Sequence, residues 1–213
     1  MNVIQIGGAS RTGLVERARR LEYFTIAYNS LEGLIAIVAG LFAGSIALVG
    51  FGFDSMIEVT SGTALLWRLR ADADARRRER AEKISLRVVG ICFLALALYV
   101  AADSVKSLIT HEPPERSVPG ILLAAVSLVV MPLLSRAKRE VAAAISSSAL
   151  RADAKQTELC TYLSAILLGG LLLNALFGWW WADPVAALVM VPIIGREGIE
   201  ALRGERCGDC GCH

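Results

Sequence analysis

The chain has 213 residues, of which 55% are hydrophobic, and its formal net charge is only +2. A mean hydropathy of +0.55 is too high for an ordinary soluble domain, and several apolar runs reach the ~20 residues that span a bilayer. The small net charge excludes a general affinity for nucleic acid. These properties predict an all-α, polytopic membrane protein in contact with lipid.

The first residues, MNVIQIGGASRTG, resemble a strand that leads into a glycine-rich nucleotide-binding turn. Such a turn needs a βαβ unit around it and an acidic residue further along the chain. A membrane-length apolar run follows instead, too late and too long for a cleaved signal peptide. We therefore interpret residues 1–21 as a cytoplasmic N-terminal segment without a nucleotide site.

Six transmembrane helices are predicted within one domain at residues 22–202. They cover residues 22–41, 43–69, 84–109, 118–134, 140–177 and 184–202, with loops at 70–83, 110–117 and 136–139. Basic residues gather before the first span, in the first and third of these loops, and after the sixth span. By the positive-inside rule, both termini are cytoplasmic. The expected location is a cell membrane, the bacterial inner membrane, which the chain crosses several times.

The second predicted span contains two acids, Asp54 and Glu58, which share a helix face because they are four residues apart. An ionised carboxylate at the bilayer centre costs ~3 kcal/mol or more. A sequence tolerates such a pair beside a cation, a cavity or a partner charge. We expect no Lys or Arg at mid-depth in the other spans, so a structural ion pair is the less favoured explanation.

The fifth predicted span begins with one polar helical stripe at i, i+3, i+4 and i+7, formed by Asp153, Gln156, Thr157 and Cys160. Within it, Gln156 and Cys160 repeat the four-residue spacing of the two acids on the second span. Opposed faces of the two spans would gather four donor atoms, which suits a tetrahedral, zinc-like ion. Cys160 by itself is also explained as a small buried hydrophobic residue.

Several stretches, in this order, resemble the cation diffusion facilitator (cation efflux) family. Residues 29–62 are similar to its first two spans, LRADAKQTELC to the start of its fifth span, and WADPVAALVMVPII to its sixth. The likeness covers residues 22–202. It implies a divalent metal/proton antiporter that works by alternating access, with zinc, cadmium or cobalt as the transported ion. It implies neither a cofactor nor an enzymatic reaction.

The resemblance places the metal ligands on Asp54, Glu58, Gln156 and Cys160. The last two stand where the family has a histidine and an aspartate. A Cys160 thiolate together with the two carboxylates gives the site a formal charge of −3, and the thiolate favours softer metals such as zinc, cadmium or mercury. Three further polar residues are candidates for the ion route. Asn29 and Glu32 lie in the first span, and Asp153 lies in the fifth span, on the cytoplasmic side of the predicted ligands.

The family adds a cytoplasmic domain after the sixth span that supports a dimer, whereas residues 203–213 alone follow here. We expect a short form without that domain, for which a homodimer rests on the family resemblance. This tail contains soft metal ligands at Cys207, Cys210, Cys212 and His213. Such a composition is typical of metal binding, so a metal-capture tail and an incidental chain end are both open interpretations.

Two other functions are also open. A membrane metal sensor or metal donor would use the same ligands without transport. An intramembrane hydrolase would need carboxylates that face each other from different spans. Asp54 and Glu58 share one helix, so the sequence favours the transporter.

Overall fold

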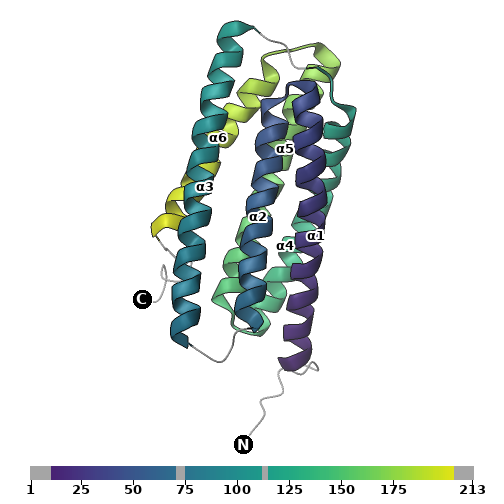
Figure 1. The fold of residues 1–213 in the computed structure, drawn as a ribbon. Coiled ribbons are helices and arrows are strands. Elements are labelled where there is room, and N and C mark those ends of the chain that lie inside the picture. The colour runs from purple at the N-terminus through teal and green to yellow at the C-terminus, as the bar shows by residue number, and fades with distance from the viewer. Residues whose placement is uncertain (1–10, 71–74, 112–114, 204–213) are drawn as a thin grey trace, which may run out of the picture.

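A computed structural model describes residues 11–70, 75–111 and 115–203, and within these ranges the protein consists of α-helices without strands (Figure 1). The helices are α1 (Arg11–Ala43), α2 (Ile46–Arg70), α3 (Ala75–Thr110), α4 (Val118–Ala144), α5 (Ser148–Phe177) and α6 (Ala182–Arg203). The predicted all-α fold with six helices is therefore confirmed.

Four of these helices are long and apolar enough to cross a membrane by themselves: Gly13–Ala43, Gly90–Thr110, Val118–Ala144 and Asp153–Phe177. α2 and α6 have 25 and 22 residues, which corresponds to about 33 Å or more and exceeds the ~30 Å hydrocarbon core. Their charged residues, such as Asp54 on α2 and Glu197 on α6, make them less apolar. The chain is a multi-pass membrane protein.

Several predicted boundaries are wrong, because charged segments continue the helices. The stretch at 136–139 is part of α4, and the turn to α5 lies at 145–147 instead, so residues 140–144 do not belong to the fifth span. Ser147 caps α5 by accepting a hydrogen bond from Leu150 N at 3.3 Å. In the same way, α1 begins at Arg11, and α3 begins within the predicted loop at 70–83.

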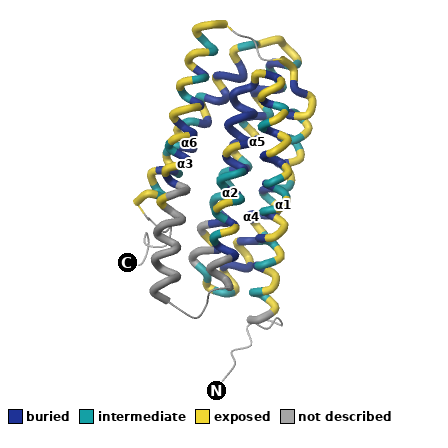
Figure 2. The backbone as a smooth tube through the Cα atoms, in the orientation of Figure 1, coloured by how far each residue is buried: buried dark blue, intermediate teal, exposed yellow. Residues whose placement is uncertain are grey.

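The helices pack as three close pairs, α1 with α2, α4 with α5, and α3 with α6. α2 also contacts α3, α5 and α6, and it lies between the α3–α6 pair and α1 (Figure 1). Its first half is buried almost continuously, as the dark blue segment in Figure 2 shows. α1 begins and α6 ends toward the same end of the bundle, where α4 also meets α5 (Figure 1).

The start of α2 is held by a carboxylate from α6. Asp183 accepts hydrogen bonds from Ser45 Oγ at 2.5 Å, Ile46 N at 3.0 Å and Ala47 N at 3.4 Å. A carboxylate at a helix N-terminus satisfies backbone N–H groups that have no partner within the helix, and it also opposes the helix dipole. Asp183 is buried, so this contact fixes the position of α2 from a neighbouring helix.

α1 and α2 approach each other closely at glycines, as small residues permit between membrane helices. A Cβ atom on Gly52 would lie 2.7 Å from Ile37 Cγ1, 2.9 Å from Ile37 N and 3.0 Å from Gly33 O. Two of these three neighbours are backbone atoms, which cannot rotate away. Any larger residue at this position must therefore push α1 and α2 apart.

We expect Gly52→Ala to destabilise the folded protein by about 1–3 kcal/mol, because it overpacks this contact. The measurement is the thermal unfolding midpoint of the purified protein in detergent. Gly169→Ala is the matched control, since a Cβ atom at Gly169 meets nothing within 4 Å. A Gly52→Ala midpoint equal to that of Gly169→Ala would show that the two helices separate without cost.

Candidate metal centre

α2 and α5 bring two carboxyl groups and a thiol together in the buried part of the bundle. Cys160 Sγ on α5 lies 2.8 Å from Glu58 Oε2 and 3.1 Å from Asp54 Oδ2 on α2. The exposed fractions are 5% for Asp54, 0% for Glu58 and 1% for Cys160. The four-residue spacing of the two acids places both toward α5, as the sequence pattern indicates.

These contacts between acidic groups require protons, because deprotonated groups at such distances would repel one another. A thiol has one hydrogen, so it donates to one carboxyl oxygen at a time, and the second contact needs a proton from a carboxylic acid. A divalent cation placed among the three groups would replace these protons. The cluster is therefore chemically suited to exchange protons for a metal ion.

Among the described residues, no group of three or more His, Cys, Asp or Glu side chains is arranged so that it could hold a metal ion. Tetrahedral zinc with one sulfur and one oxygen ligand separates those two atoms by about 3.5 Å. The 2.8 Å and 3.1 Å contacts of Cys160 are shorter than this. Metal binding would require the thiol and carboxyl groups to move apart, so the ligand assignment stays a prediction.

Thr157 contacts the acids, whereas Gln156 makes no hydrogen bond to them. Thr157 Oγ1 donates to Glu58 Oε1 at 2.6 Å. Gln156 is half-buried, and its buried Nε2 has no hydrogen-bond partner within the described residues. Both residues belong to the predicted stripe, and the helical pattern alone does not show which edge of that stripe faces α2.

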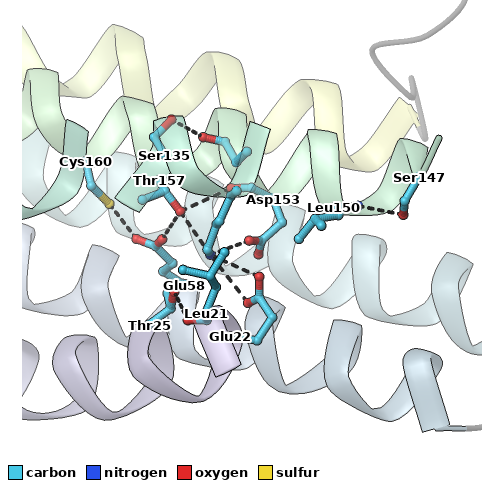
Figure 3. Close-up of polar contacts among 12 residues, drawn as sticks. Leu21, Glu22, Thr25, Glu58, Ser135, Ser147, Leu150, Asp153, Thr157 and Cys160 are labelled. Atoms are coloured by element: carbon cyan, nitrogen blue, oxygen red, sulfur yellow. Dashed lines mark hydrogen bonds and ion pairs between the residues drawn. The ribbon is translucent and has the colours of Figure 1, made fainter. Parts of the chain in front are cut away.

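A buried lysine, predicted from the sequence to lie in a loop, extends this cluster toward the end of the bundle where α4 meets α5. Lys138 on α4 has no exposed surface, and its Nζ lies 2.5 Å from Asp153 Oδ2 and 3.3 Å from Glu22 Oε1. It also donates to Thr157 Oγ1 at 3.2 Å. Asp153, predicted as part of the ion route, is thus held in an ion pair. Figure 3 shows the resulting chain of contacts from Glu22 to Cys160.

The remaining predicted route residues lie on α1, close to the acid cluster. Glu32 is 2% exposed and accepts a hydrogen bond at 3.0 Å from Ser55 Oγ, the neighbour of Asp54. Asn29 is fully buried, and neither polar atom of its side chain has a hydrogen-bond partner in the described part of the chain. An unpaired buried polar group lowers the free energy of unfolding by about 1–3 kcal/mol, so binding of a polar group or ion beside Asn29 would be favourable.

The predicted metal-capture tail, with Cys207, Cys210, Cys212 and His213, lies outside the described residues. Sequence reasoning also missed Glu22, which is fully buried on α1. An acid within a long apolar helix was the available signal. Glu22 is the first residue of the first predicted span, directly after the basic stretch that contains Arg19 and Arg20.

A helical, multi-pass membrane protein with buried acids, a thiol and a lysine between its helices has the composition of an ion transporter. Residues 23–204 match the family described as the cation efflux transmembrane domain. This match covers most of the chain, so the protein belongs to that family, and the predicted resemblance is confirmed.

Among proteins with similar sequences is the cation-efflux pump FieF of Shewanella oneidensis, 24% identical over 172 residues that cover 78% of this chain and 58% of the pump. An uncharacterized transporter of Methanocaldococcus jannaschii is 26% identical over 182 residues, covering 83% of this chain and 64% of its own. One from Synechocystis is 25% identical over 178 residues, covering 78% and 56%. The chain thus spans about six-tenths of the length of these relatives.

Proposed function

We propose that the protein exports a divalent transition-metal ion, zinc, cadmium or cobalt, in exchange for protons. One observation carries this proposal: the Cys160 thiol lies within 2.8 Å and 3.1 Å of the Glu58 and Asp54 carboxyl groups, between two packed helices. Membership in the cation efflux family supports it further. No covalent reaction and no cofactor is part of the proposal.

Proton exchange follows from the chemistry of the three groups. Each must lose its proton to bind a metal ion, and each regains one when the metal leaves. Protons and metal thus compete for Asp54, Glu58 and Cys160, so a proton gradient across the membrane can drive metal in the opposite direction. Gln156 would complete the ligand set after a change of side-chain rotamer, because its amide oxygen is a neutral ligand on the same helix face.

Both termini are proposed to lie in the cytoplasm. The basic residues before the apolar part of α1, near the end of α2 and near the end of α4 occur toward one end of the bundle (Figure 1). Positive residues favour the cytoplasmic side of a membrane protein. Metal would therefore enter from this end and leave from the end where α1 turns into α2.

The test is uptake of zinc, cadmium and cobalt into liposomes that contain the purified protein. Uptake should be faster when a pH gradient is imposed. When an ionophore collapses that gradient, the uptake rate should fall to the rate measured without a gradient. Metal that binds to the protein but never accumulates in the lumen would favour the alternative, a membrane metal sensor or metal donor. An uptake rate that is the same with and without the pH gradient would show that metal transport is not coupled to protons.

A further inference from the structure

Three helices contribute charged side chains to one buried layer beside the metal centre. Glu22 comes from α1, Lys138 from α4 and Asp153 from α5, and their exposed fractions are 0%, 0% and 5%. Lys138 is the single buried Lys or Arg among the residues whose burial the structure describes. Asp153 and Cys160 lie two helical turns apart on α5, about 10 Å along the axis. The layer therefore lies between the metal centre and the end of the bundle where α4 meets α5.

The opposite side of the metal centre is closed by different chemistry. About one to two helical turns beyond Asp54 and Cys160, the chain packs an apolar cluster that includes Leu48, Phe51, Leu163 and Leu167. None of these four side chains is more than 2% exposed. Packing closes one side of the centre and an ion cluster closes the other. Of the two, only the ion cluster can respond directly to the charge of an arriving cation.

The ion cluster still has an oxygen that can accept a cation. Lys138 Nζ contacts Asp153 Oδ2 at 2.5 Å, whereas Asp153 Oδ1 has no hydrogen-bond partner among the described residues, although the side chain is buried. Two carboxylates around one ammonium leave a formal charge of −1 in the layer. A divalent ion interacts with carboxylates more strongly than a single ammonium does, since Coulomb energy scales with charge.

We propose that Glu22 and Asp153 form a second cation site on the metal route, which Lys138 occupies as a tethered cation. A divalent metal arriving from the α4–α5 end displaces the ammonium and then passes to Asp54, Glu58 and Cys160. The inference rests on the proposed function for the direction of travel, but the second site itself is defined by the contacts of Lys138.

Thr157 links this second site to the metal centre. An ammonium group only donates hydrogen bonds, so Thr157 Oγ1 accepts from Lys138 and donates its hydrogen to Glu58 Oε1 at 2.6 Å. The same hydroxyl lies 3.2 Å from the Asp153 carbonyl oxygen, where it can donate once Glu58 takes a metal. Thr157 therefore contacts both Lys138 of the second site and Glu58, a predicted ligand of the metal centre.

Binding of Mn²⁺, measured by electron paramagnetic resonance on the purified full chain, tests the second site directly. Manganese prefers oxygen ligands, so the thiols of the chain compete little. We expect Lys138→Met to bind Mn²⁺ at least ~10-fold more tightly than the parent, because the tethered competitor is gone. Adding Glu22→Gln and Asp153→Asn should abolish the gain. Equal affinity in Lys138→Met and the parent would overturn the second site.

Arg139→Met is the matched control. Arg139 is the next residue on α4 and also pairs with α5, through Glu158 at 2.9 Å, but it is exposed. The variant changes the net charge by the same amount as Lys138→Met. Its Mn²⁺ affinity should equal that of the parent. An equal gain in both variants would assign the effect to overall charge and overturn the proposal.

Zinc transport by the neutral triple variant, Glu22→Gln, Lys138→Met and Asp153→Asn, keeps the proposal testable if Lys138→Met does not fold. Neutral replacement of a complete buried ion cluster is often tolerated. We expect KM for zinc to rise at least ~5-fold, because the first docking site is lost while Asp54, Glu58 and Cys160 remain. An unchanged KM, with only a lower maximal rate, would assign the cluster a structural role and overturn the proposal. If the parent itself fails to transport, the proposed function is wrong, and Mn²⁺ binding still decides the second site.

Discussion

Asp54→Asn is expected to lower the rates of zinc and cadmium transport at least ~100-fold. This exceeds the ~10–100-fold loss that is usual when a residue hydrogen-bonded to a metal ligand is removed. The substitution keeps the size of the side chain but removes one of the three acidic groups that we propose bind the metal. Without the Asp54 carboxylate, fewer negative charges would balance the two positive charges of a divalent ion bound inside the bilayer. The measurement is the initial rate of metal uptake into liposomes at equal amounts of folded protein.

Asp103→Asn provides the comparison for this experiment. Asp103 lies on α3, outside the metal centre, and its carboxylate accepts a long hydrogen bond of 3.5 Å from the Tyr99 hydroxyl. It is half-buried and contributes to no contact of the cluster. Transport by Asp103→Asn should stay within about twofold of the parent. If Asp54→Asn also transports at the parent rate, Asp54 is not a ligand and the centre has been placed wrongly.

The membrane fold was predictable because four of the described helices are apolar runs of membrane length. An apolar run of membrane length leaves few alternatives to a spanning helix, since every backbone polar group must be paired within lipid. The errors occurred where that signal ends. Residues 136–139 contain three basic residues and were interpreted as a loop, yet α4 continues to Ala144 with Arg136 and Arg139 exposed. A helix can leave the membrane without ending.

The contacts among the candidate ligands were predictable only in part, because sequence spacing gives the face of a helix but not its partner. The spacing of Asp54 and Glu58, together with the position of Cys160, correctly indicated that these side chains face each other. It did not reveal that Lys138, assigned to a loop, turns inward to Asp153. That contact depends on the axial register of α4 against α5, which no local pattern of residues specifies.

Cys160 has two possible roles, as a metal ligand and as a contact between helices. The thiol contacts both carboxyl groups, so it contributes to joining α2 to α5 as well as to the proposed metal site. A substitution at this position therefore tests two properties at once. Removal of the thiol affects its contacts with Glu58 and Asp54, whereas replacement by another acid mainly affects the choice of metal.

Cys160→Asp is expected to keep transport but to lower the cadmium-to-zinc rate ratio about tenfold, because a carboxylate favours harder cations than a thiolate does. The formal charge of the deprotonated site stays the same in this variant. Cys160→Ala should lose transport of both metals, since Gln156 is neutral and cannot replace an anionic ligand. Both rates are measured with the same liposomes under the same pH gradient.

Cys160→Ser separates the ligand role from packing, because it keeps the size and the hydrogen-bond donor of the thiol but ionises far less readily. If Cys160 serves only to join the helices, Cys160→Ser and Cys160→Ala would transport both metals in the parent ratio. Cys160→Asp would then chiefly reduce the amount of folded protein, by adding an unpaired charge beside Asp54 and Glu58. If instead the thiolate binds the metal, Cys160→Ser loses cadmium transport more than zinc transport, and Cys160→Asp remains folded with its preference shifted. The ratio of the two metals, normalised to folded protein, thus distinguishes a ligand from a structural contact.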